Sequence, residues 1–353
     1  MGFVNLLAAT KLGDAIGKLI YNVLFSWIQG WSDNWGLIGA FSVTVIMFTI
    51  VLKLIVMPFD FWQKQITRSN AKKMEQMKPQ LEKITKQCGT NKELLMQKQR
   101  ALYKQYKYST FGACLPMIIT LAIFFIVFGG FNSAVRIHNK TIYENLEKVY
   151  DSAYYAVIDG EEYAALTNAE KKAEAVRQAE QAVLDNYKGE RFFWIKNIFI
   201  GDNWKKPIPS AADFTGTGMG ASGVTDVDAG KYEIVMRPLM EEYNDGWNGY
   251  LILPILVLLI NVAMMALNKQ PQQPAIAGQS EEQAKAQQTQ MKMMQYVMPV
   301  MMLVFALFYS SAFTLYMLVN SIITTIFNLS FNIITKRVDA KEKDRLLSTT
   351  VKK

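Results

Sequence analysis

The feature that most constrains this chain is a series of apolar stretches, each long enough to cross a lipid bilayer as a helix. Windows of about 19 residues find such stretches near residues 35–58, 112–134 and 248–267. A further apolar run covers the 43 residues from Met293 to Thr335, enough for two spans that turn back near residues 309–311. Lipid offers no hydrogen-bond partners to a backbone, so each span must be helical. We therefore expect an all-α polytopic membrane protein with five transmembrane helices.

The charges of the connecting segments predict the orientation, because Lys and Arg are retained on the cytoplasmic side. Residues 60–109 carry twelve basic and four acidic residues, and residues 336–353 carry seven basic and three acidic ones. Residues 136–247 carry thirteen basic and nineteen acidic residues. The sequence thus predicts a multi-pass membrane protein with its N-terminus outside and its C-terminus in the cytoplasm.

These patterns divide the chain into ten predicted segments. They are an amphipathic interfacial helix (1–33), a first span (34–58), a basic cytoplasmic helical hairpin (59–109), a second span (110–135), an external, mostly helical insertion (136–246), a third span (247–267), a cytoplasmic linker (268–292), a fourth span (293–310), a fifth span (311–335) and a basic cytoplasmic tail (336–353). The first residues have no basic region followed by a long apolar core, so we expect no cleavable signal peptide.

In the N-terminal segment, apolar residues recur at spacings of three and four: Ile16, Ile20, Leu24, Trp27 and Trp31. The segment is too polar to span a membrane, so the pattern predicts a helix lying in the outer interface with tryptophan anchors. The alternative is a helix that packs on the external domain through the same face.

The cytoplasmic segment has the periodicity of a helical hairpin. Met74, Met77, Leu81 and Ile84 follow one helical face, and Leu95, Leu102 and Tyr106 follow another. Between them, Thr90 with Glu93 predicts a capping box at a second helix that starts near Asn91. Pro79 is expected to kink or break the first helix. One packed seam leaves the basic surface free, and we expect partner contacts at Lys72, Lys73, Lys78, Lys83 and Lys86.

Outside the spans, few residues suggest chemistry. Thr167 and Glu170 predict a capping box for a long helix that ends at Gly189. The lone His138 has no Cys or acidic cluster beside it and is expected at the surface. Cys88 and Cys114 fall on or near the cytoplasmic side, where thiols stay reduced. We therefore expect no disulfide, metal site or cofactor.

Polar residues within the spans are the strongest functional signal. Lys53 lies among aliphatic residues in "IVLKLIVMP", and a charge at the centre of a spanning helix costs about 2.5–3.5 kcal/mol on insertion scales. Other polar residues lie at helical intervals or singly within spans: Ser42, Thr49, Thr120, Asn261, Thr314, Ser321, Thr324 and Asn328. In one interpretation these faces line a hydrophilic groove with Lys53 as its positive charge. In the other they hold helices together, and Lys53 snorkels to the interface.

Several motifs resemble the YidC/Oxa family of membrane protein insertases over nearly all of the transmembrane portion. "VLKLIVMPF" puts Lys53 where the family has an arginine a few residues before a proline, and "KKMEQMKPQLEKI" is similar to the family's basic hairpin. "LYKQYKYSTFGACLPMI" resembles the entry to the second span. "FFWI", "YLILP", "MKMMQYVMPVMMLVF" and "TLYMLVNSI" resemble the later spans.

The chain departs from the family pattern at a few positions. Thr120 stands where glutamine is usual, Ala122 where a second proline is usual, and Met317 where tryptophan is usual. "SSAF" replaces a Pro-Ala-Gly between the last two spans. The external insertion is also larger than in minimal members.

The resemblance implies an insertase of the bacterial plasma membrane that carries out no covalent chemistry. Its five spans would surround a hydrophilic groove open to the cytoplasm and to lipid, in which Lys53 attracts acidic residues of a translocating segment. Implied partners are nascent membrane proteins, the ribosome, a targeting receptor, a Sec translocon and the lipid bilayer. Two other functions stay open from the residues alone: a small-anion transporter or channel, and a structural subunit of a membrane complex.

Overall fold

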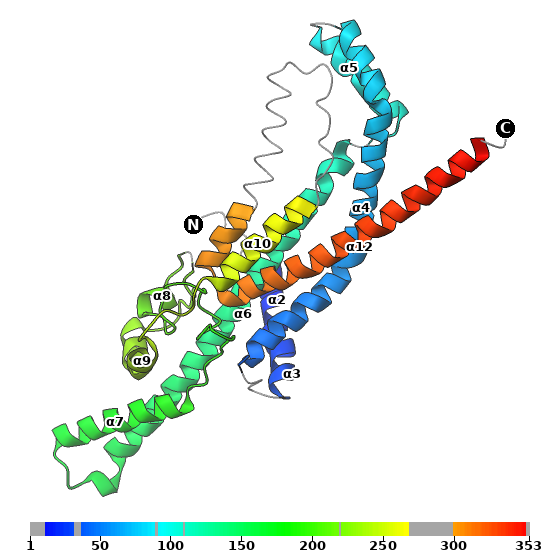
Figure 1. Cartoon of the computed structure of the whole chain (residues 1–353). Helices are drawn as coiled ribbons and strands as arrows, with labels where there is room; N and C mark the ends of the chain where they lie inside the picture. The colour runs from blue at the N-terminus through cyan, green and yellow to red at the C-terminus, as the bar shows by residue number, and fades with distance from the viewer. Residues whose placement is uncertain are drawn as a thin grey trace. The chain divides into compact units, whose positions relative to one another are not determined.

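The computed structural model describes residues 11–31, 37–88, 91–108, 110–218, 220–267 and 299–350, and of residues 92, 110–118, 120, 121 and 342–350 it describes the backbone alone. Its named elements are helices (Figure 1). The chain divides into two compact units. The first unit comprises Met1–Ile50, Ile123–Val257 and Met302–Leu318, and the second comprises Val51–Ala122, Leu258–Met301 and Val319–Lys353.

Three helices are much longer than a membrane is thick: α4 (Ala40–Cys88), α6 (Thr110–Asp159) and α12 (Ser311–Thr350). Among the fully described residues, α4 and the part Ser311–Lys341 of α12 are long and apolar enough to cross a membrane. Two shorter helices are also apolar, α10 (Ile252–Leu267) and Pro299–Phe308. The structure is thus all-helical with two long apolar helices, and the number of five spans stays a prediction.

The long helices continue past the segment boundaries that the sequence suggests. Helix α4 runs on beyond residue 58 into the hairpin, α6 beyond residue 135, and α12 beyond residue 335. Pro58 and Pro79 both lie inside α4, so of the kink or break expected at Pro79 the break is wrong, and the kink stays a prediction. A proline removes one backbone hydrogen bond, and the rest of the ladder holds the helix. The turn expected at residues 309–311 is confirmed, because one helix ends at Phe308 and α12 begins at Ser311.

In the first unit, the N-terminal segment packs on α6. It consists of α2 (Lys11–Lys18), the π-helical turn η1 (Leu19–Phe25) and α3 (Ser26–Gln29). The Asp14 carboxylate accepts a hydrogen bond from Ser133 and pairs with Arg136, and Ile20 is fully buried. Trp27 and Trp31 are exposed. One face therefore packs on α6 near residues 130–136 rather than on the body of the external insertion, while the two tryptophans stay at the surface.

The insertion between residues 136 and 246 folds around its own core. Helices α7 (Asn168–Asn186), α8 (Ala211–Thr215) and α9 (Ala229–Tyr243) pack on the second half of α6, with Tyr143, Val183, Phe214 and Tyr232 among the buried residues. The capping box of Thr167 and Glu170 is confirmed. Helix α7 ends at Asn186, three residues before the expected Gly189.

His138 is buried rather than exposed, which corrects the expectation from the sequence. Its side chain lies among the rings of Tyr21, Phe25, Phe41 and Phe199, with ring centroids 4.4–5.5 Å apart. Neither ring nitrogen has a hydrogen-bond partner among the described residues. This burial lowers the pKa of His138 to about 3. The imidazole is therefore neutral at physiological pH and serves as part of an aromatic core.

In the second unit, the end of α4 and α5 (Lys92–Gln105) form the expected helical hairpin. Met74, Met77, Leu81 and Leu102 make its buried seam. The capping residue of α5 is Asn91, whose side chain accepts the backbone N–H of Leu94. The sequence assigned this role to Thr90, which lies outside the described residues, as do the predicted linker 268–292 and residues 1–10.

Candidate functional site: a buried ion pair and a helix-end loop

Lys53 is buried, although it lies in a stretch of α4 whose other residues are apolar and partly exposed. Its neighbours Leu54 and Ile55 are 60% and 71% exposed, whereas Lys53 is 8% exposed. Its ammonium lies 2.7 Å from a carboxylate oxygen of Asp60. Residues seven apart lie on the same helix face, so the two side chains reach toward each other along α4. The charge that the sequence singles out is thus one half of an ion pair, and Asp60 is the residue that sequence reasoning missed.

A polar face runs along α12 in the same unit as Lys53. Ser321 and Asn328 are buried at 8% and 6% exposure. The hydroxyl of Thr324, one helical turn from each, is buried and has no hydrogen-bond partner among the described residues. Asn261 of α10 is half-buried in this unit, and the side chain of Thr120 lies outside the described residues. This face therefore holds polar groups on the buried side of α12, while the apolar Ile322, Ile326 and Leu329 are exposed.

Within the second unit, α4 and α12 contact each other at several side chains and run in the same direction. The rings of Phe61 and Phe331 are 5.8 Å apart, and the Lys64 ammonium lies 6.0 Å from the centre of the Phe331 ring. Two turns further along both helices, Arg68 pairs with Asp339. Burial lowers the pKa of Lys64, and the negative charge of Asp60 partly opposes this.

The cationic residues of the hairpin differ in what they contact. Lys72 also pairs with Asp339, at 2.9 Å, and the Lys73 ammonium donates to the backbone carbonyl of Lys107 at the far end of the hairpin. Two of the five residues predicted for partner contacts therefore take part in contacts within the chain. The other three are exposed: Lys78, Lys83 and Lys86.

The remaining predicted groove residues lie in the first unit and bond to backbone. Ser42 donates to the carbonyl of Arg191 at 3.3 Å, and Thr49 donates to the carbonyl of Val45 at 2.6 Å. Thr314 donates to the carbonyl of Ser310 one turn earlier and to the carbonyl of Ala306 in the preceding helix. All three are at most 1% exposed. Their hydroxyls are already satisfied. The bond from Thr314 to Ala306 joins two helices, whereas the bond of Thr49 stays within α4.

A loop formed by residues 190–203, here called the helix-end loop, binds the first residues of α4. The buried carboxylate of Glu190 accepts the backbone N–H of Phe41 at 3.0 Å. The carbonyl of Arg191 accepts the N–H of Gly39 at 2.8 Å. The first N–H groups of a helix have no partners within the helix and carry a partial positive charge, so a carboxylate there is stabilising. The loop thus fixes where α4 begins.

The same loop caps α10 through Asp202. This fully buried carboxylate accepts the backbone N–H groups of Tyr250, Leu251 and Leu253 at 2.7–3.1 Å, and also the indole N–H of Trp194. Leu251 has a φ of +65°, a conformation that costs a non-glycine residue about 1–3 kcal/mol. The bonds to Asp202 hold the backbone in that state. A single carboxylate therefore sets the start of α10.

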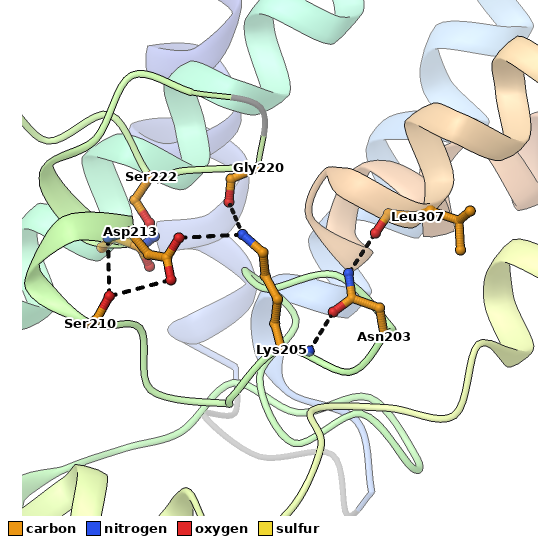
Figure 2. Close-up of polar contacts among 8 residues, drawn as sticks. Asn203, Lys205, Ser210, Asp213, Gly220, Ser222 and Leu307 are labelled. Carbon is orange, nitrogen blue, oxygen red and sulfur yellow. Dashed lines mark hydrogen bonds and ion pairs between the residues drawn. The ribbon is translucent and has the colours of Figure 1, made fainter.

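The loop also contacts the turn between helix Pro299–Phe308 and α12. The carbonyl of Ile200 accepts the backbone N–H and the hydroxyl of Ser311. Figure 2 shows the amide of Asn203 donating to the carbonyl of Leu307. Nearby, Lys205 donates to the carbonyl of Gly220, where a side chain would collide with Phe308. The ends of four apolar helices therefore meet at one loop, which no motif in the sequence had indicated.

Buried amides keep the helix-end loop in place. The Asn248 side chain accepts the N–H of Asn197 and donates to the carbonyls of Asn197, Ile200 and Gly201. The Asn197 side chain accepts the N–H of Phe199 and donates to the carbonyl of Pro207. Such fully satisfied networks are rigid, because every alternative arrangement leaves a buried polar group without a partner. Within the described residues, no cluster of His, Cys, Asp or Glu has the geometry of a metal site.

Comparison with known proteins places these features in a family. The family model described as "60Kd inner membrane protein" matches residues 31–339. A membrane protein insertase YidC from Fusobacterium nucleatum is 31% identical over 119 residues, which cover 33% of this chain and 55% of that protein. The YidC of Nitratidesulfovibrio vulgaris is 30% identical over 112 residues, covering 31% of this chain and 20% of that protein.

A third relative shows the same limited overlap. The YidC of Syntrophobacter fumaroxidans is 29% identical over 125 residues, covering 35% of this chain and 21% of that protein. The matched region thus spans about half of the Fusobacterium relative and about a fifth of the other two. The family model, in contrast, covers most of the present sequence. The chain belongs to the 60Kd inner membrane protein family, the YidC/Oxa family of polytopic membrane proteins.

Proposed function

We propose that this protein is a membrane protein insertase that acts by holding polar segments of nascent membrane proteins within the bilayer. The observation that carries the proposal is the buried Lys53–Asp60 pair on an apolar helix. A charge in such a helix is costly unless it is solvated or paired with an opposite charge. The polar face of α12 in the same unit adds hydroxyl and amide groups, which would find no hydrogen-bond partners in lipid.

The proposed groove is lined by Lys53, Asp60 and the α12 face of Ser321, Thr324 and Asn328. A polar external segment of a client enters it, so that the distance it must cross in hydrocarbon becomes shorter. An acidic client residue competes with Asp60 for the Lys53 ammonium, and this attraction is stronger in a low dielectric than in water. The client's apolar helix then leaves toward lipid. No covalent step is needed.

The proposed topology has five spans, an external N-terminus and a cytoplasmic C-terminus. In this arrangement the hairpin of α4 and α5 and the end of α12 lie in the cytoplasm. The exposed Lys78, Lys83 and Lys86 then face the ribosome, a targeting receptor or the nascent chain, and phosphate-rich RNA is attracted by such a basic surface. Larger clients would be handled beside a Sec translocon.

The ion pair weighs against the second candidate, a small-anion transporter with Lys53 as its binding charge. A small anion must displace the Asp60 carboxylate, which lies at 2.7 Å, from free solution, whereas an acidic residue of a client is held beside the pair by its own chain at a high effective concentration. A structural subunit, the third candidate, would need neither the charge pair nor the unpartnered Thr324 hydroxyl.

Photo-crosslinking tests the proposal directly. A photoreactive amino acid at Ser321 or Asn328 should form an adduct with the polar segment of a ribosome-stalled, single-span client. The same amino acid at Leu259, which is 57% exposed on α10, serves as the control. Equal labelling of the polar segment from Leu259, or none from either α12 position, would refute the groove.

Charge substitutions then separate the groove from mere helix packing. Lys53→Met should slow the insertion of a client with acidic residues in its external segment, and Lys53→Arg should not. A client whose external segment is neutral should insert equally well in both variants. If Lys53→Met has no effect on either client, the charge has no role in insertion.

A further inference from the structure

The first unit contains a cavity of about 650 Å³ that none of the features above uses. One wall is the segment from Tyr187 to Lys196, and the other is the end of α9 with the residues that follow it, up to Asp245. Pro207 and Ile208, both buried, also line it. Small-molecule sites typically occupy about 300–1,000 Å³. The cavity is therefore large enough for a headgroup-sized ligand.

The two walls carry opposite charges. Lys188, Arg191 and Lys196 line the cavity from the first wall, and Glu242 and Asp245 line it from the second. All five side chains are exposed to solvent. The Lys196 ammonium lies 2.7 Å from an Asp245 oxygen, so the walls meet at that point. A ligand that satisfies both walls carries an anionic and a cationic group.

Between the charged groups the lining is aromatic and apolar. The rings of Tyr187 and Tyr243 also line the cavity, with their centroids 5.5 Å apart. Tyrosine combines an apolar ring with a hydroxyl. It is therefore enriched at interfaces, where the ring contacts apolar groups and the hydroxyl contacts water or polar groups. This lining suits the short hydrocarbon linker of an ester better than it suits a bare inorganic ion.

The cavity lies beside the start of a spanning helix. Gly39, which lines it, directly precedes α4, and α4 is one of the two long apolar helices. Phe193 is bonded to Leu37 through its backbone, and its side chain is 49% exposed. Tyr250, just before α10, is 66% exposed. Tyr and Trp are enriched at the level of the lipid headgroups, so the exposed Tyr250 supports a position of the cavity near that level.

We propose that this cavity binds a zwitterionic phosphoester, namely the phosphoethanolamine headgroup of a phospholipid. The phosphate lies at Lys188 and Arg191, because Lys and Arg form strong charge-assisted hydrogen bonds with phosphate oxygens. The ammonium group lies at Glu242 and Asp245. A bound headgroup would contact the segment whose carbonyl at Arg191 holds Gly39, and so would reinforce the start of α4. The proposal does not depend on the insertase function.

The test uses the full chain in nanodiscs with a phosphatidylethanolamine that carries a photoreactive group near its headgroup. Labelled peptides are identified by mass spectrometry, and phosphatidylglycerol with the same group provides an anionic comparison. In the wild type, labelling should concentrate on residues 187–196 and 242–245. Phosphatidylethanolamine should label these segments more strongly than phosphatidylglycerol.

Two pairs of substitutions separate the roles of the walls. Lys188→Gln with Arg191→Gln should reduce labelling by both lipids roughly tenfold, because charge-assisted hydrogen bonds to the phosphate are lost. Glu242→Gln with Asp245→Asn should abolish the preference for phosphatidylethanolamine. Arg191 holds α4 through its carbonyl, so replacing its side chain leaves that contact in place. Lys172→Gln with Glu233→Gln, at exposed positions outside the cavity, is the matched control.

Other results would overturn the proposal. Equal labelling in the cavity variants and the control would show that the lipid contacts are non-specific. Stronger labelling by phosphatidylglycerol in the wild type would indicate a site for anions alone. Protection of the cavity by a co-purified polypeptide, with no lipid adduct, would assign the cavity to a protein partner. Competition by inorganic phosphate as strong as by soluble glycerophosphoethanolamine would show that the ammonium is not recognised.

Discussion

Lys53 and Asp60 form an ion pair along one face of α4, with 2.7 Å between the ammonium nitrogen and a carboxylate oxygen. Their side chains are only 10% and 21% exposed, so each charge depends largely on the other. Removing one partner leaves a poorly solvated charge, whereas removing both leaves an apolar contact.

Asp60→Asn should therefore be more destabilising than the double replacement of Lys53 by Met and Asp60 by Leu. We expect the single variant to lower the free energy of unfolding by about 1–3 kcal/mol. Thermal unfolding of the purified protein in detergent measures this. A double variant that is less stable than Asp60→Asn would mean that the pair stabilises the fold beyond charge compensation.

Asp202→Ala should destabilise the first unit, because three backbone N–H groups at the start of α10 lose their acceptor. Loss of a helix cap costs about 0.5–2 kcal/mol, and full burial places this site at the upper end. Hydrogen exchange at residues 250–253 should rise. Glu233→Ala, at an exposed position on α9, is the control and should have little effect.

His138 predicts a pH dependence of stability. Its pKa is about 3 in the folded protein and about 6.5 when unfolded, so the unfolded state binds the proton more readily at acidic pH. The free energy of unfolding should thus fall as the pH decreases from about 6.5 toward 3, by about 2 kcal/mol at pH 5 for this residue. His138→Phe should remove that part of the loss. Unfolding followed at pH 7.5 and pH 5 checks it; parallel losses in both proteins would contradict the role of His138.

Met77→Ala should loosen the hairpin of α4 and α5, because Met77 is fully buried in its seam. Truncation of such a core side chain costs about 2–5 kcal/mol. Limited proteolysis between residues 74 and 106 should accelerate, while Lys78→Ala, at an exposed neighbour, should leave the cleavage rate unchanged. Similar rates in both variants would show that the seam does not hold the hairpin closed.

The hairpin shows which structural features can be predicted from periodic patterns in the sequence. Met74, Met77 and Leu81 identify a helical face whatever the partner, and that face is the buried seam. The exact cap was not predictable, because Thr90 and Asn91 are both good capping residues and the choice depends on local geometry. Likewise, the sequence could not show that α4 continues through Pro79. Whether a proline ends a helix depends on whether packing along the rest of the helix exceeds the free energy of the lost hydrogen bond.

Burial of single polar residues was harder to anticipate. His138 has no periodic partner, and its aromatic neighbours come from three separate parts of the chain: Tyr21 and Phe25, Phe41, and Phe199. Asp60 could have been found, since a spacing of seven places it on the same helix face as Lys53. Glu190 and Asp202 could not, because their partners are 149 and about 50 residues away in sequence.

Residues a few positions apart were enough to predict the helical class, the apolar helices, the periodic faces and the helix face that Lys53 shares with Asp60. Only the folded chain shows which polar groups distant in sequence are paired. It brings the carboxylates of Glu190 and Asp202 to the starts of α4 and α10, and the start of α12 to the same loop. The physical reason is that a buried polar group must find a partner wherever the fold brings one within hydrogen-bond distance, and that distance is set by the packing of the whole chain.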